Sequence, residues 1–134
     1  MEIWTMKIEC VHGWYLEEES AKICEIESSC DLSELRHFIL ESFEFDNDHR
    51  HQFFISRNPV KSKREVFENE SETLNAIFPI LKSHHFFMHF DFGDNWVFKI
   101  TRSRKKSVFF SELNYPRVIE QLGKNPEQYP KHEE

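Results

Sequence analysis

Apolar and polar residues alternate with a period of two along several stretches of the chain, and this pattern is typical of β-strands with one buried face. The stretches cover residues 3–11, 21–27, 49–55, 85–92 and 96–102. We expect the first two to pair as antiparallel neighbours. The last two flank a Gly-Asp-Asn sequence at residues 93–95, which predicts a β-hairpin.

A main helix is predicted to follow the second strand. Asp31 offers an N-cap carboxylate, and Glu34 three residues later completes a capping-box pattern. Apolar residues then recur at helical spacing and predict one buried stripe. They are Leu35, Phe38, Ile39 and Phe43. The helix is expected to end near Phe45, because the Asp-Asn-Asp sequence after it is typical of a turn.

The remaining segments are expected to be short or irregular. Residues 57–72 are charged and predict a surface loop with a short edge strand near residues 65–67. Residues 73–78 predict one or two helical turns, which the following proline stops. Residues 102–106 predict a basic loop, and the chain from Tyr115 onward predicts a short helix at most.

Together these elements predict an α+β fold, in which an antiparallel sheet of about five strands carries one main helix packed on one face. We expect a single domain over residues 1–134, with a polar C-terminal tail from about residue 123. The chain contains 14 phenylalanines, and each one that is buried stabilises the fold by about 1.5–3 kcal/mol. The core is therefore expected to be aromatic. Its expected members are Phe38, Phe53, Phe86, Phe90, Trp96 and Phe98.

Composition and charge limit the function classes. The formal net charge of −7 gives no overall attraction to phosphate backbones, so nucleic acid would need a local basic patch. The N-terminus lacks the pattern of a signal peptide, and no run approaches the ~20 apolar residues that cross a bilayer. We therefore expect a cytoplasmic protein without a membrane partner. Cys10, Cys24 and Cys30 form no C-x-x-C pair and are expected to be free thiols.

The most informative stretch is residues 90–96, Phe-Asp-Phe-Gly-Asp-Asn-Trp. Its two carboxylates, Asp91 and Asp94, could ligate a cation or act as general acid and base. More commonly, an aspartate in a turn accepts hydrogen bonds from nearby amides, and a glycine such as Gly93 supplies a positive φ. We therefore favour a structural role for the two aspartates, which the turn would hold at the sheet edge.

Histidines could add a metal site to this turn. His49 and His51, like His85 and His89, alternate along a predicted strand, so each pair projects to one side about 7 Å apart. No established zinc-binding spacing is present, and imidazoles bonded to carboxylates are the favoured interpretation. We expect no metal and no other cofactor; if a metal were bound, His49, His51 and Asp91 would be its ligands. The candidate functional cluster is His49, His51, Asp91, Asp94 and Trp96.

A second candidate surface is the basic run at residues 102–106. A basic finger with aromatic neighbours could grip a phosphate backbone. The run contains Arg102, Arg104, Lys105 and Lys106. In an acidic domain the favoured interpretation is a solvated loop tip, so nucleic-acid binding is possible but not favoured.

Several motifs carry a family resemblance. One motif joins the helix to the following strand and reads Leu32-x-x-Leu35-x-x-x-Ile39, then Phe45-Asp46-x-x-His49-x-His51-x-Phe53-x-Ile55. Another is the turn at residues 90–96, and Tyr-Pro pairs follow at residues 115–116 and 129–130. Together they resemble the plasmid pRiA4b ORF-3-like family, whose hallmark is an aromatic-Asp-Phe-Gly-Asp-x-Trp turn. The resemblance implies a compact α+β domain of bacteria, archaea and their plasmids without a settled activity, and it links some members to mobile elements.

Three functions stay open at this level. The first is a non-enzymatic binding module that contacts an unidentified protein partner through the surface near the turn. The second is a metal-assisted hydrolase that uses the His/Asp cluster. The third is DNA binding through residues 102–106. We favour the first, because each chemical motif also has a common structural explanation.

Overall fold

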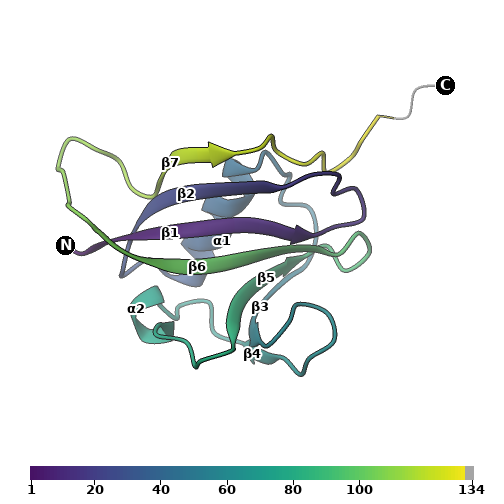
Figure 1. Ribbon diagram of the computed structural model, residues 1–134, viewed down its shortest axis with the longest axis horizontal. Helices are drawn as coiled ribbons and strands as arrows, with labels where there is room; N and C mark the ends of the chain where they lie inside the picture. The colour runs from purple at the N-terminus through teal and green to yellow at the C-terminus, as the bar shows by residue number, and fades with distance from the viewer. Residues whose placement is uncertain (132–134) are drawn as a thin grey trace.

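Seven strands form one antiparallel sheet in the computed structural model, which describes residues 1–131 (Figure 1). The strands lie in the order β4-β3-β5-β6-β1-β2-β7. Their bounds are Ile3–His12 for β1, Ser20–Glu27 for β2, His51–Ser56 for β3, Glu65–Phe67 for β4, His85–Phe90 for β5, Trp96–Ser107 for β6 and Arg117–Leu122 for β7. The helices are α1 (Leu32–Ser42) and α2 (Leu74–Ile77). None of the helices described is long and apolar enough to cross a membrane.

The expected fold class is wrong in its balance of helix and strand. Strands take up 40% of the chain and helices 11%, so the helices are minor elements and not one main helix that defines the packing. The sheet also has seven strands in place of about five. Residues 102–106 continue β6 instead of forming a loop, and the segment after Tyr115 forms β7 instead of a short helix. The strand β7 lies at an edge and is largely exposed, so it lacks the alternation that marks a half-buried strand.

Other expectations about the sheet are confirmed. The hairpin of β5 and β6 pairs in register from Phe86↔Ile100 to Phe90↔Trp96. The strand β1 pairs antiparallel with β2, as expected. The structure adds that β6 is its neighbour on the other side. The short edge strand is present as β4, and the brief helix before the proline is present as α2. The β1–β6 pair therefore runs the length of the molecule and links its two ends (Figure 1).

The two faces of the sheet are covered differently. The helix α1 lies behind β1 and β2 in Figure 1, and its buried residues join the main core. Of the expected core aromatics, five are buried, and Phe38 is half-buried at the margin. The opposite face carries a smaller cluster of Phe54, Phe87 and Val97. The guanidinium of Arg64 lies 3.9 Å from the centre of the Phe54 ring, so the loop after β3 helps to cover this second cluster.

The start of α1 follows the sequence prediction, because the Asp31 carboxylate accepts a hydrogen bond of 2.8 Å from the Glu34 amide. The helix ends at Ser42, where a left-handed residue turns the chain. Glu44 has φ 60, and the amide of Phe45 donates to the carbonyl of Leu40 over 2.8 Å. This is the 6→1 bond of a Schellman motif. It directs residues 46–49 toward the end of the β5–β6 hairpin.

Candidate functional site

The turn between β5 and β6 takes its shape from an aspartate and an asparagine. Asp91 has φ 62 and Asn95 has φ 54, whereas Gly93 is not left-handed. The expectation that Gly93 supplies the positive φ is therefore wrong. Aspartate and asparagine tolerate this region better than other residues with a side chain. The Asn95 amide donates to the Asp91 carbonyl over 2.6 Å, and this bond closes the turn.

The Asp91 side chain stabilises the same turn from inside. Its Oδ1 accepts hydrogen bonds from the amides of Gly93 at 3.0 Å and Asp94 at 3.2 Å. The residue is only 5% exposed, although it stands at the end of a hairpin. Its second oxygen, Oδ2, lies 3.4 Å from His49 Nε2. Oδ1 is therefore hydrogen-bonded within the protein, and Oδ2 faces the imidazole of His49.

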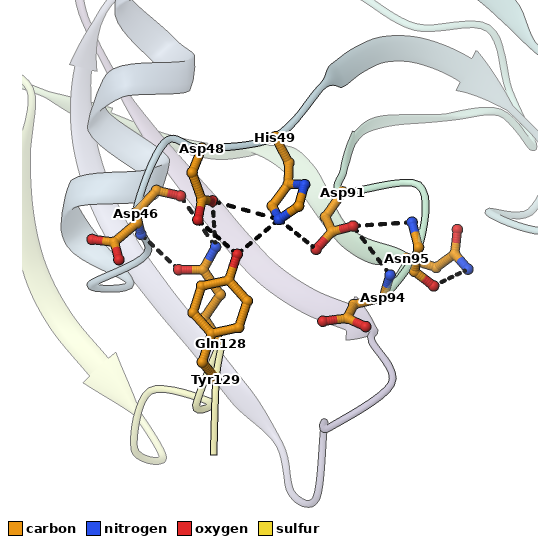
Figure 2. A network of polar contacts seen from close by, with 9 residues as sticks. Asp46, Asp48, His49, Asp91, Asp94, Asn95, Gln128 and Tyr129 are labelled. Atoms are coloured by element: carbon orange, nitrogen blue, oxygen red, sulfur yellow. Dashed lines mark hydrogen bonds and ion pairs between the residues drawn. The ribbon is translucent and has the colours of Figure 1, made fainter. Parts of the chain in front are cut away.

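A chain of polar contacts continues outward from His49, as Figure 2 shows. The hydroxyl of Tyr129 donates to Asp48 Oδ2 over 2.7 Å. Because that hydroxyl has a single proton, it accepts from His49 Nε2, which lies 2.8 Å away and therefore carries hydrogen. Partial burial, and then the hydrogen bond to Asp48, raise the pKa of the Tyr129 phenol above its usual value. Tyr129 thus stays a neutral phenol that bridges the two side chains.

The segment that bears Tyr129 is fastened to the loop after α1. Gln128 is buried, and its Oε1 accepts from the Asp46 amide over 2.6 Å while its Nε2 donates to the Asp46 carbonyl over 3.1 Å (Figure 2). Nε2 also lies 3.2 Å from Asp48 Oδ1. These bonds join residues that are about eighty positions apart in the chain. No local pattern in the sequence could have placed Gln128 and Tyr129 beside His49.

The structure brings together part of the predicted cluster. His49 and Asp91 are in contact, and Asp94 lies in the same turn (Figure 2). Trp96 is fully buried beneath the turn, where its ring packs edge-on against Phe45 with centroids 4.9 Å apart. His51 is not part of this arrangement. In residues 1–131 there is no group of three or more His, Cys, Asp or Glu side chains that could hold a metal ion.

His51 belongs to a separate cluster at the edge of the core. Its Nε2 contacts the carboxylate of Glu70, and the same carboxylate accepts from Arg36 over 2.7 Å. Burial opposes ionisation of Glu70, but the hydrogen bond and charge of His51, together with Arg36, outweigh it and lower the pKa of this carboxyl. His51 and Arg36 therefore hold the loop that bears Glu70 against α1 and β3.

A third cluster, which the sequence did not reveal, lies on the opposite face of the sheet. His89 is buried, with Nδ1 2.9 Å from Arg64 Nη1 and Nε2 2.9 Å from Asn95 Oδ1. An arginine only donates, so Nδ1 accepts and Nε2 carries the hydrogen. Burial lowers the pKa of His89, and the charge of Arg64 adds to that effect. The sequence marks His89 only by its alternation with His85, and nothing in it pairs His89 with Arg64.

Three aromatic residues that contact the turn or its neighbours are partly or largely exposed. Trp14 is 75% exposed, and its amide donates to the Asp94 carbonyl over 2.8 Å. Phe92 is 46% exposed and packs edge-on against His89, with ring centroids 4.6 Å apart. Tyr129 is 49% exposed. We call these three residues and Asp94 the turn rim.

The basic residues lie at the other end of β6, far from the turn. Arg102, Arg104, Lys105 and Lys106 line a groove with a volume of about 750 Å³. Arg102 stacks on the ring of Trp4, with its guanidinium carbon 3.7 Å from the ring centre. The sequence placed these cations on a loop tip, whereas the structure places them on a strand beside aromatic side chains.

Comparisons with known proteins identify the family. The family model of the plasmid pRiA4b ORF-3-like protein matches residues 16–128, so the chain belongs to this family. A crystal structure of a protein of unknown function, MM3350 from Methanosarcina mazei Go1, is similar to it with a TM-score of 0.70 and 16% sequence identity. The similarity covers 90% of this chain and 69% of that one, and it shows a shared fold. The search of curated proteins finds no match. Neither the description of the family nor that of the similar crystal structure names an activity.

Proposed function

We propose that this protein is a non-enzymatic binding module that contacts a protein partner through the turn rim. The observation that supports this proposal is the contrast between bonded polar groups and exposed aromatic side chains at the turn. The polar groups beneath the turn are bonded to one another, while three large aromatic residues near it are 46% to 75% exposed. Tryptophan and tyrosine are the residues that most often dominate the binding energy of protein interfaces.

The alternative of a metal-assisted hydrolase receives less support from the same geometry. One Asp91 oxygen accepts hydrogen bonds from two amides, and the other lies 3.4 Å from His49 Nε2. Asp91 is also only 5% exposed, so a metal or a substrate has little access to this carboxylate. The imidazole of His49 is bonded in turn to Tyr129. A metal or a substrate would have to break these contacts before it could reach either residue.

Two side chains of the turn rim, Phe92 and Tyr129, are held in place before a partner arrives, and Trp14 is held at its backbone. The backbone of Trp14 is bonded to Asp94, Phe92 rests on a buried histidine, and the Tyr129 hydroxyl is bonded to Asp48. A side chain that is already ordered loses less entropy on binding, a cost of about 0.5–1.5 kcal/mol for each mobile side chain. Phe92 and Tyr129 therefore combine exposed apolar area with the rigidity that favours recognition, and Trp14 adds further exposed area.

The proposal is tested with variants of the rim and a matched control. The double variant W14A/F92A removes the aromatic surface, whereas Leu81→Ala removes an equally exposed apolar side chain from the loop before β5. Immobilised wild-type protein and Leu81→Ala should capture the same partner from a lysate of the source cells. The double variant should capture at least about tenfold less, which corresponds to about 1.4 kcal/mol.

Two results would contradict this proposal. One is capture that the double variant retains in full. The other is stoichiometric metal on untagged protein after metal is supplied, together with hydrolytic activity that is lost in Asp91→Asn. The second result would favour the hydrolase instead.

A further inference from the structure

A groove at the end of the sheet opposite the turn combines positive charge with aromatic side chains. It lies between the start of β1 and the end of β6, near the N-terminus in Figure 1, and has a volume of about 750 Å³. Nine or ten residues of an extended strand separate it from the turn rim, which is about 30 Å. Its lining includes Trp4 and Phe109, and all four cations of the segment 102–106.

The charge of this groove is unlike that of the rest of the chain. Four of the seventeen Lys and Arg residues lie within five positions, in a protein whose formal net charge is −7. Glu2 is the acidic residue in the lining, and it contacts the indole of Trp4. Among the ion pairs formed within residues 1–131, none involves the four cations. Their charge is therefore available to a bound anion.

The backbone presents these cations on a bulge. The strand β6 is paired with β1 at Arg102↔Met6 and next at Lys106↔Trp4, so residues 103–105 oppose Thr5 alone and the β6 side has two extra residues. On its other side, β6 has no partner here, because β5 pairs with β6 only up to Phe86↔Ile100. Arg104 and Lys105 are exposed on this bulge. A bulge re-aims side chains at the margin of a sheet.

An aromatic ring stands at the same groove in a fixed position. Phe109 is 38% exposed and packs against Tyr115, with ring centroids 5.6 Å apart. The Tyr115 hydroxyl accepts from the amide of Phe110 over 3.1 Å and donates to the carbonyl of Val108 over 3.4 Å. These bonds brace the loop that carries Phe109. A flat base can stack on such a ring, whereas a carboxylate of an acidic peptide gains nothing from it.

We propose that this groove binds single-stranded nucleic acid, with phosphates on Arg104, Lys105 and Lys106 and a base on Phe109. A short single strand contacts the groove alone. A duplex would also bring its phosphates toward the acidic remainder of the surface, where like charges repel. This site does not include the turn rim, so a test of one proposal does not decide the other.

Fluorescence anisotropy with a short labelled oligothymidine tests the proposal at low salt. Three or four phosphate contacts predict that the logarithm of the association constant falls with the logarithm of salt concentration with a slope of about −2 to −3. Charge reversal in R104E/K105E should weaken binding at least about tenfold. The matched variant Lys61→Glu, which reverses an exposed cation outside the groove, should change it less than about twofold.

A second pair of measurements separates base stacking from simple attraction to a polyanion. Phe109→Ala should weaken oligothymidine binding roughly 5- to 100-fold. It should leave the weaker binding of an abasic oligomer unchanged. No binding at low salt would overturn the proposal, and so would equal losses in R104E/K105E and Lys61→Glu. If Phe109→Ala has no effect and a glutamate-rich peptide binds as tightly as oligothymidine, the groove takes acidic protein segments and not nucleic acid.

Discussion

Substitutions at Asp91 separate its structural role from a catalytic one. The wild-type carboxylate accepts hydrogen bonds from two amides, and the residue has a left-handed backbone with φ 62. A side-chain acceptor of this kind at a chain turn stabilises a protein by about 0.5–2 kcal/mol, as N-caps show. A residue without a polar side chain costs a further 1–2 kcal/mol, roughly, in the left-handed region. The variant Asp91→Ala should therefore lower the free energy of unfolding by about 2–3 kcal/mol.

Two further substitutions divide this value between its causes. Asp91→Asn keeps an oxygen acceptor and tolerates the left-handed backbone, but it loses the charge, which about doubles the strength of such bonds. It should cost about 0.5–1 kcal/mol. Asp91→Gly loses the acceptor but adopts a positive φ without strain, so it should cost about 1 kcal/mol. The expected order of stability is wild type, asparagine, glycine and then alanine.

Urea unfolding of the four proteins at neutral pH, followed by tryptophan fluorescence, measures these differences. Trp96 is buried directly beneath the turn and reports on its integrity. The reasoning is refuted if Asp91→Ala is as stable as wild type within about 0.5 kcal/mol, or more stable. A stabilising substitution would mean that the carboxylate is retained at a cost to stability, as is common for catalytic groups. Equal values for alanine and glycine would refute the backbone part of the argument.

Three other predictions concern stability and its dependence on pH. A Cβ atom at Gly13 would lie 2.1 Å from Cε3 of the buried Trp96 ring. The variant Gly13→Ala should therefore lower the free energy of unfolding in urea by about 3 kcal/mol. A loss below about 0.5 kcal/mol would contradict this. Glu44 occupies the left-handed position after α1. The variant Glu44→Gly should therefore raise the free energy of unfolding by about 0.5–1 kcal/mol. An unchanged midpoint of urea unfolding would show that the backbone is not strained there. The pKa of His89 is lowered from 6.5 in the folded protein, so the unfolded chain binds the extra proton first and stability falls as pH drops below about 6.5. Between about pH 7 and pH 5, His89→Gln should therefore lose less stability than wild type. The control variant His37→Gln, at an exposed position, should follow wild type. Parallel curves of stability against pH for all three proteins would show that His89 does not cause this loss.

The sequence by itself determined those elements whose defining residues lie within a few positions of one another. The β5–β6 hairpin was predictable, because apolar residues alternate on both of its arms and turn residues join them. The start of α1 was predictable as well, since the Asp31 cap and the Glu34 amide are three positions apart. The aromatic core followed from the same alternation.

The edge of the sheet depended on pairing between distant segments. Residues 117–122 have no alternation of their own and become β7 because β2 offers them an open edge, where Arg117 also forms an ion pair with Glu25 at 3.3 Å. The basic residues of the segment 102–106 form part of β6 because β1 continues beside them. Backbone hydrogen bonds do not depend on side-chain pattern, so a strand held mainly by its neighbour leaves little trace in the sequence.

The candidate site also combines contacts between neighbouring residues with contacts between residues far apart in the chain. The sequence alone indicated that the Asp91 turn carries carboxylates beside aromatic side chains, because those residues are consecutive. Only the tertiary structure brought His49 to Asp91 and His51 to Glu70. It also placed the Tyr129 hydroxyl between His49 and Asp48. A hydrogen bond needs two groups within about 3 Å of each other. For groups some eighty positions apart, as for His49 and Tyr129, that distance is decided by the path of the whole chain.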